Sequence, residues 1–286
     1  MDIAAGNGRG SGQPGVAPQA DLIFVEVSAG DVDWSGPRSV FNSFGDSVQM
    51  LEAVKFIFDT AGDRPCVVNL SLGTNGGPHD GSSLVEQGFD ALVSQKPNRA
   101  IVLAAGNAQE DGVHTMGVVP AGGQLDVSWT TTAGGGGEFE LWYGGGQRLR
   151  AELLGPDDEV LASVAPGENF PLGAGHGEIA AFLASRINDP NNKDNVIGIW
   201  LAPNWPDGEV KVRLHALVPQ EVPFHAWIER MDEGQALFDT PLASHLLGSL
   251  STGKHTVVVG AYDARKSGEP AASFSSAGPT RDGRPK

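Results

Sequence analysis

The chain has 286 residues, which is long enough for two domains with a sizeable hydrophobic core. Hydrophobic residues make up 40% of it and charged residues 19%, proportions typical of a globular rather than a disordered protein. The formal net charge of −16 argues against nucleic acid and anionic membranes as partners, because both attract basic surfaces.

The single cysteine, Cys66, excludes an intramolecular disulfide. It lies in an apolar run, where we expect a buried structural thiol. No run reaches the roughly twenty apolar residues of a membrane-spanning helix, so we expect no membrane partner. A basic segment followed by an apolar one, the pattern of a signal peptide, does not open the sequence.

The N-terminal region reads as a glycine-rich loop followed by a strand. Gly10, Gly12 and Gly15 match G-x-G-x-x-G, but a phosphate loop needs a strand before it and a helix after it. Here the segment that follows, Asp21–Val27, has the pattern of a strand. We therefore do not predict a nucleotide site.

Helices and strands then alternate. Asp46 is expected to cap a helix that Gly62 and Pro65 end, and a strand follows over Cys66–Leu72. After the turn-rich stretch Thr74–Gly81, either of two serines caps a second helix, and the next strand covers Ile101–Ala105. Such alternation predicts parallel β-α-β crossovers, whose ligands bind beyond the carboxyl ends of the strands.

After His114 the pattern changes to short strands with turns between them, which predicts a β-sandwich or jelly roll. Four tryptophans fall inside these strands and should fill the core, whereas Trp205 lies in a proline-rich turn and should be exposed. The expected strands are Gln124–Thr131, Glu138–Trp142, Leu149–Leu154, Glu159–Val164, Glu178–Leu183, Asn195–Leu201, Glu209–Val218 and Phe224–Glu229, and the tryptophans are Trp129, Trp142, Trp200 and Trp227.

The last part of the chain returns to the first pattern, with a buried strand expected over Thr256–Ala261 and a turn over Tyr262–Gly268. We therefore expect residues 1–116 and 240–286 to form one discontinuous α/β domain. Residues 117–239 would be an all-β domain inserted into it.

Four segments occur in the order found in one family. They read GVAP (15–18), VNLSLG (68–73), AAGN (104–107) and ASFSSAGP (272–279). Together they resemble the subtilase family of subtilisin-like serine endopeptidases. The resemblance implies a parallel-sheet α/β fold, incomplete here, and some members carry an inserted β-sandwich.

The resemblance also assigns site residues. It implies that Asn107 is the oxyanion-hole asparagine, a neutral donor at the carboxyl end of a strand. Ser71, Leu72 and Gly73 would form the edge that pairs with substrate backbone, and Ala104, Ala105 and Gly106 would line the wall of the first specificity pocket. An ordinary strand followed by a Gly-Asn turn explains each segment alone.

The family's catalytic histidine and serine lie in HGTH-like and GTS motifs, and neither motif occurs in this sequence. We therefore expect the catalytic Asp, His and Ser to lie outside this chain, which alone would be inactive. The alternative is a non-catalytic peptide- or protein-binding pseudoprotease or adhesion module. Loss of the helices that carry His and Ser would expose apolar sheet surface, which predicts homo-oligomers or a complementing chain.

We expect no cofactor. Calcium stays open at two loops rich in oxygen ligands, Asn188–Asn195 and Asp157-Asp158, although such turns need no metal. None of the seven histidines has a spacing that implies a triad or a metal site; they are His79, His114, His176, His215, His225, His245 and His255. The family resemblance implies a peptide or protein substrate and an extracellular or envelope location.

Overall fold

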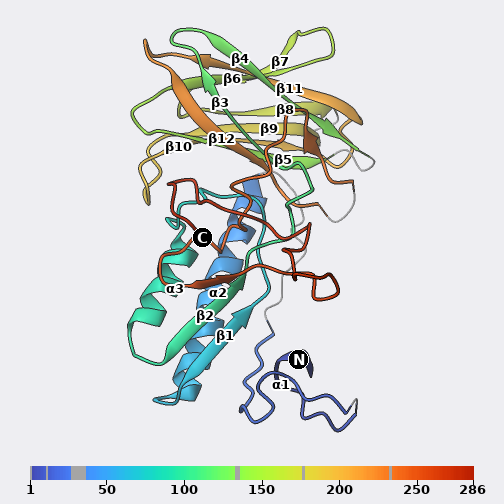
Figure 1. Cartoon of the computed structure of the whole chain (residues 1–286). Helices are drawn as coiled ribbons and strands as arrows, with labels where there is room; N and C mark the ends of the chain where they lie inside the picture. The colour runs from blue at the N-terminus through green and yellow to red at the C-terminus, as the bar shows by residue number, and fades with distance from the viewer. Residues whose placement is uncertain (1, 11, 27–36, 133–135, 176–177, 232–233) are drawn as a thin grey trace.

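The computed structural model describes residues 2–10, 12–26, 37–132, 136–175, 178–231 and 234–286. These residues form a small α/β part and a larger part made of two antiparallel sheets, with the α/β part below the two sheets in Figure 1. The architecture is thus one of mixed sheets with few helices. No described helix is long and apolar enough to cross a membrane.

The α/β part is built on a three-stranded parallel sheet in the order β1-β2-β14. Its strands are β1 (Cys66–Leu70), β2 (Arg99–Ala104) and β14 (Val257–Val259), and its helices are α1 (Asp2–Ala5), α2 (Pro37–Ala61) and α3 (Leu84–Ser94). Parallel neighbours need a crossover, and α3 supplies the one between β1 and β2. Its amphipathic face buries Val85 and Phe89, and Ser83 caps its first turn as expected.

The second part contains a six-stranded sheet in the order β3-β12-β5-β10-β9-β8 and a five-stranded sheet in the order β13-β4-β11-β6-β7. The first is made of β3 (His114–Val119), β12 (Val222–Ile228), β5 (Gly137–Tyr143), β10 (Asn195–Leu201), β9 (Glu178–Arg186) and β8 (Asn169–Gly175). The second is made of β13 (Leu237–Phe238), β4 (Gln124–Thr131), β11 (Gly208–Ala216), β6 (Leu149–Leu154) and β7 (Val160–Val164).

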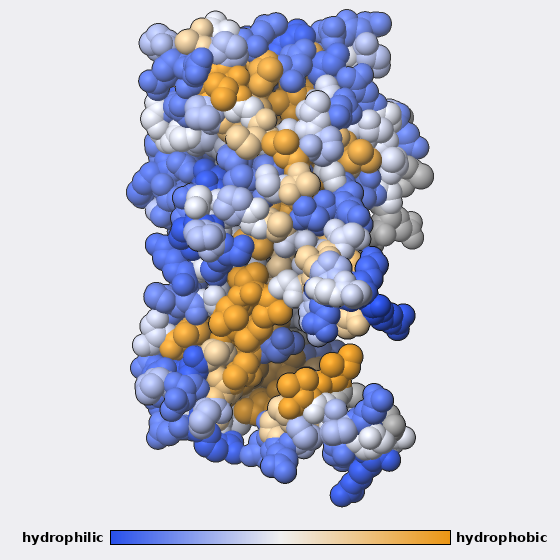
Figure 2. All heavy atoms as spheres, in the orientation of Figure 1, coloured by the Kyte–Doolittle hydropathy of each residue, from blue (hydrophilic) through white to orange (hydrophobic). Residues whose placement is uncertain are grey.

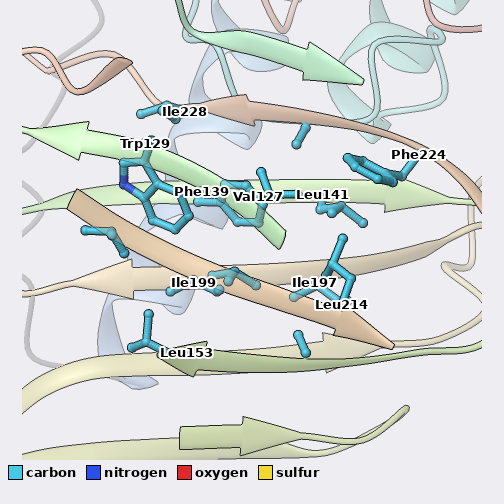
Figure 3. Packing of buried hydrophobic residues seen from close by; sticks show 14 of the residues in the cluster. Val127, Trp129, Phe139, Leu141, Leu153, Ile197, Ile199, Leu214, Phe224 and Ile228 are labelled. Carbon is cyan, nitrogen blue, oxygen red and sulfur yellow. The ribbon is translucent and has the colours of Figure 1, made fainter. Parts of the chain in front are cut away.

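The two antiparallel sheets share one hydrophobic core, which Figure 3 shows between their strands. Trp129 of β4 stacks on Phe139 of β5 with ring centroids 4.9 Å apart, and Phe238 meets both rings edge-on. Strand alternation sends every second side chain into this space. Trp142 and Trp227 are buried on the opposite face of the six-stranded sheet, which faces the α/β part (Figure 1).

Several expectations about elements were wrong. Asp21–Val27 was expected to be a strand, but the described residues 21–26 pair with no other strand, and Leu22 and Phe24 are exposed. The helix expected to begin at a cap on Asp46 begins at Pro37, so Asp46 lies inside α2.

Two burial predictions also failed. The strand β14 was expected to be buried over Thr256–Ala261, but it covers only Val257–Val259 and exposes both end residues, because it lies at the edge of its sheet. Trp205 was expected to be exposed, but it is partly buried against the core of the two antiparallel sheets.

Candidate functional site

The segments assigned by sequence leave the parallel sheet at the same edge. Leu70 pairs with Leu103 at the carboxyl ends of the parallel strands β1 and β2. Ser71–Gly73 therefore begins beside the point where Ala104–Asn107 begins. The three residues of Ser71–Gly73 are exposed, and so is Asn107. In open α/β sheets, ligands bind across the carboxyl ends of the strands, where these exposed residues lie.

The turn that carries Asn107 is held from both sides by Ser276. The backbone N–H of Ser276 donates to the carbonyl of Gly106 at 3.0 Å, and the Ser276 Oγ accepts from the N–H of Ala108 at 2.9 Å. Gly106 has φ +111°, and a Cβ there would come 2.8 Å from the Ser276 Oγ. A glycine is needed at this position, and the clamp fixes the backbone that presents the Asn107 amide.

A short loop connects the two strand ends. The N–H of Gly248 donates to Ala105 O at 2.9 Å, and the N–H of Ser249 donates to Thr74 O at 2.8 Å. In addition, the Ser251 hydroxyl donates to Ala104 O at 2.7 Å. Ala105 itself is buried and donates to Val259 O of β14. The small residues Ala104–Gly106 thus line one side of a rigid frame rather than a mobile loop.

A buried carboxylate anchors this loop to α3. Glu86 accepts from the N–H of Thr252 at 2.8 Å and from its hydroxyl at 2.6 Å, and the Ser83 hydroxyl donates to its second oxygen at 2.7 Å. Burial raises the pKa of Glu86 despite these hydrogen bonds. Sequence reasoning missed Glu86, because in sequence it looks like an ordinary acidic residue in a first helical turn.

Carboxylates of the six-stranded sheet hold the loop that follows Ser71–Gly73. Glu229 accepts from the N–H groups of Asn75 at 2.7 Å and Gly76 at 3.0 Å. Glu140 accepts from Gly77 N–H at 2.7 Å and from the indole of Trp142 at 3.0 Å. The two-sheet part therefore helps to position the loop that follows Ser71–Gly73.

A third glutamate lies beside these two. Burial, with the nearby charges of Glu140 and Glu229, raises the pKa of Glu138 to about 8. Burial also raises the pKa of Glu229, against the effect of its backbone donors. Ionisation of these carboxyl groups is unfavourable, because the negative charges would lie close together in a poorly solvated space.

Arg281 ties the C-terminal segment to the same junction. Its guanidinium contacts Asp80 and Asp194, each at 2.7 Å, and lies 5.7 Å from the ring of Trp142. Arg281 also donates to Pro78 O at 2.6 Å. Residues from the α/β part, from the two-sheet part and from the chain end thus meet in one network of hydrogen bonds.

The loop Asn188–Asn195, a calcium candidate, satisfies its oxygens within the protein. Asp189 accepts from Asn191 N–H and contacts Arg186, whereas Asp194 contacts Arg281. In the other candidate loop, Asp158 contacts Lys211 at 2.8 Å. These donor sets fit turn stabilisation better than calcium coordination, so no step of the proposed chemistry passes through a metal.

Three of the histidines, which sequence spacing left unconnected, come together. His114 begins β3, His225 is in β12, and His245 is in the loop after β13. Burial, and then the neighbouring histidines, lower the pKa of His114 to about 3. Burial likewise lowers the pKa of His225 to about 4, and lowers that of His245. Burial therefore favours the neutral form of each of the three imidazoles.

Comparisons with known proteins agree with the resemblance stated above. Residues 2–138 match the model of the subtilase family. The structure is similar to that of the CspB protease of Clostridium perfringens, with a TM-score of 0.69 and 23% identity. The match covers 82% of this chain and 49% of that one, so the chain spans about half the length of that protease. At this identity the structural likeness shows the fold alone.

A search of curated proteins found no match. The family match spans residues 2–138, a little under half of the chain, and over this span the chain is similar to the subtilase family. This span includes Ser71–Gly73 and Ala104–Asn107, the segments from which the site was assigned by sequence.

Proposed function

We propose that the chain is part of a subtilisin-like serine endopeptidase, which hydrolyses peptide bonds by acyl transfer. In this proposal Asn107 donates its side-chain N–H to the oxyanion of the tetrahedral intermediate. The observation that carries it is the exposed Asn107 in a turn that Ser276 clamps on both sides, at the sheet edge where Ser71–Gly73 begins. An oxyanion donor must be held in place before the reaction, and the clamp supports this role because it fixes the backbone on either side of Asn107.

The substrate is an extended peptide or protein segment. Ser71, Leu72 and Gly73 would pair with its backbone as an added strand. Ala104, Ala105 and Gly106 would form the wall of the pocket for its first side chain, where small residues leave room. The exposure of Ser71–Gly73 and the carboxylates that hold the next loop support this role.

The nucleophile and its base are proposed to come from sequence that this chain does not contain. Neither an HGTH-like nor a GTS motif occurs in the printed sequence. The chain alone should therefore neither cleave casein or a peptide p-nitroanilide nor react with a fluorophosphonate probe. Serine-dependent cleavage or covalent labelling of the purified chain would refute this part of the proposal.

Residues 117–239 are proposed to be an inserted, jelly-roll-like sandwich within a discontinuous α/β domain formed by residues 1–116 and 240–286. The shared core of the two antiparallel sheets supports this division. The sheet itself already begins with β3 at His114. The contacts of Glu140 and Glu229 with the Asn75–Gly77 loop give the inserted region a positioning role as well.

Hydrophobic residues on the surface of the α/β part support an association with another copy or a complementing chain. Figure 2 shows hydrophobic surface gathered over this lower half of the molecule. Phe56 and Val67 are among the exposed residues. Light scattering over a concentration series should show assembly, and a strictly monomeric protein at high concentration would contradict it. An extracellular or cell-envelope location is proposed on the family resemblance alone.

Two experiments separate the protease from a non-catalytic binding module. The first is to sequence the coding region on either side of this chain, where in-frame HGTH-like and GTS motifs are expected. Stop codons on both sides would favour the binding module. The second is the activity of the longer polypeptide, in which Asn107→Ala should lower kcat while the exposed-strand control Asn169→Ala should not.

A further inference from the structure

A cluster of three histidines lies between the six-stranded sheet and the α/β part. One ring nitrogen from each of His114, His225 and His245 lies within 4.8 Å of the other two. The ring centroids are 5.4, 5.3 and 4.8 Å apart, so each imidazole adjoins both others. His114 is fully buried, whereas His225 and His245 are partly exposed.

The closest pair already has the spacing of metal ligands. His114 Nε2 lies 3.1 Å from His225 Nδ1. Two nitrogens bound to one tetrahedral zinc ion, each about 2.0–2.1 Å from it, lie roughly 3.3 Å apart. His114 Nδ1 is buried and is not the nitrogen that faces His225, so His114 would bind a metal ion through Nε2.

The surroundings fix the third ligand. The indole N–H of Trp227 donates to the backbone carbonyl of His245 at 2.9 Å, which holds this loop against β12 beside His225. The Ser244 hydroxyl lies 3.0 Å from His245 Nδ1. Its oxygen can accept a hydrogen bond from Nδ1–H, which leaves the lone pair of Nε2 free, and a second-shell contact of this kind accompanies ligating histidines.

We propose that His114, His225 and His245 bind one divalent transition-metal ion of the zinc class, with the fourth coordination position open to solvent. Three imidazoles suit zinc, cobalt, nickel and copper, whereas calcium and magnesium prefer oxygen ligands. Bound metal would link β3, β12 and the loop after β13. Gln109 next to the Asn107 turn also contacts this loop, through Ala243 O at 2.9 Å. The site is independent of the proposed protease function.

The test is a titration of the metal-free chain with Zn²⁺ by calorimetry, and with Co²⁺ by visible absorption. We expect one ion per chain and the ligand-field bands of cobalt bound to nitrogen in a low-coordinate site. His225→Ala should weaken zinc binding by more than about 10-fold. The control His255→Ala, at an exposed position outside the cluster, should bind as the wild type does.

His245→Ala provides a second variant in case His225→Ala fails to fold, because its side chain is partly exposed and lies on a loop. Circular dichroism checks both variants. Absence of zinc binding in the wild type would overturn the proposal. So would equal binding by the wild type and a folded His225→Ala or His245→Ala variant, or displacement of zinc by an equal concentration of Ca²⁺.

Discussion

The two parts of the molecule reach stability by different means. The two antiparallel sheets enclose a continuous core, in which aromatic and branched side chains from both sheets are almost fully buried. The three-stranded parallel sheet has a much smaller core around Phe58 and Phe89, and its edge strands expose Val67, Val257 and Val259. The candidate site lies at the carboxyl edge of this less enclosed sheet.

The difference shows how a site can be rigid on a weakly covered scaffold. Backbone groups around Asn107 and Ser71–Gly73 are fixed by side chains from elsewhere, such as Ser276, Glu86 and Glu229. Hydrogen bonds from these side chains hold the backbone of the site in place, whereas hydrophobic packing stabilises the two-sheet part.

The largest difference in the free energy of unfolding is expected between alanine variants of a buried and an exposed phenylalanine. Phe139 is buried between the antiparallel sheets, and Phe139→Ala should lower the free energy of unfolding by about 3–5 kcal/mol. Phe56 is 56% exposed on α2, and Phe56→Ala should change the free energy of unfolding by less than about 0.5 kcal/mol. Urea denaturation checks both. Similar losses for the two variants would mean that Phe56 is covered in solution.

The clamp on the Asn107 turn should have an intermediate effect. Ser276→Ala leaves the N–H of the buried Ala108 unpaired and should cost about 1–3 kcal/mol. The matched control is Ser273→Ala, since Ser273 is exposed and bonds only Glu110 in the described contacts. Hydrogen exchange should also quicken at Ala108 in the Ser276 variant alone. Unchanged exchange there would contradict the clamp.

The glutamate cluster predicts a pH dependence. The pKa of Glu138 is about 8 in the folded chain and ordinarily 4.5, so between these values the folded state retains a proton that the unfolded state has lost. The contribution of Glu138 to stability should therefore fall as pH rises from about 4.5 to 8. In a plot of the urea midpoint of unfolding against pH, Glu138→Gln should remove the decrease that Glu138 causes between these pH values. The control Glu221→Gln, at an exposed position, should retain this decrease.

The smallest effect is expected on the exposed face of α2. Lys55 and Asp59 form an ion pair one helical turn apart, with both side chains more than half exposed. Lys55→Gln keeps the helix propensity and should cost about 0.3–0.5 kcal/mol at low salt. Denaturation at two protein concentrations checks it. A loss above about 1 kcal/mol would mean that this face is buried by association.

Strands with clear alternation were predictable from sequence. Gln124–Thr131, Leu149–Leu154 and Asn195–Leu201 occur with the expected bounds. The strand β8 was missed because Pro171, Gly173 and Gly175 interrupt its pattern, which an edge strand tolerates. The strand β3 was missed as well, and Gly117 breaks its pattern in the same way.

The site was only partly predictable. The short motifs identified Asn107 and Ser71–Gly73 as candidates, and their roles remain predictions. The supports for these residues, Ser276 and Glu229, could not be found in this way, because each acts on backbone groups more than a hundred residues away. The same holds for His114, His225 and His245, which only the pairing of β3 with β12 and the return of the later loop bring together.

The most direct test of the central claim is the kcat of Asn107→Ala in the longer polypeptide of the proposed function, with Asn169→Ala as its control. The account predicts a loss in kcat of about 10²–10³, the magnitude known for removing such a donor from subtilisin, a member of this family, with little change in KM. A kcat within about twofold of the wild type would show that Asn107 does not stabilise the oxyanion.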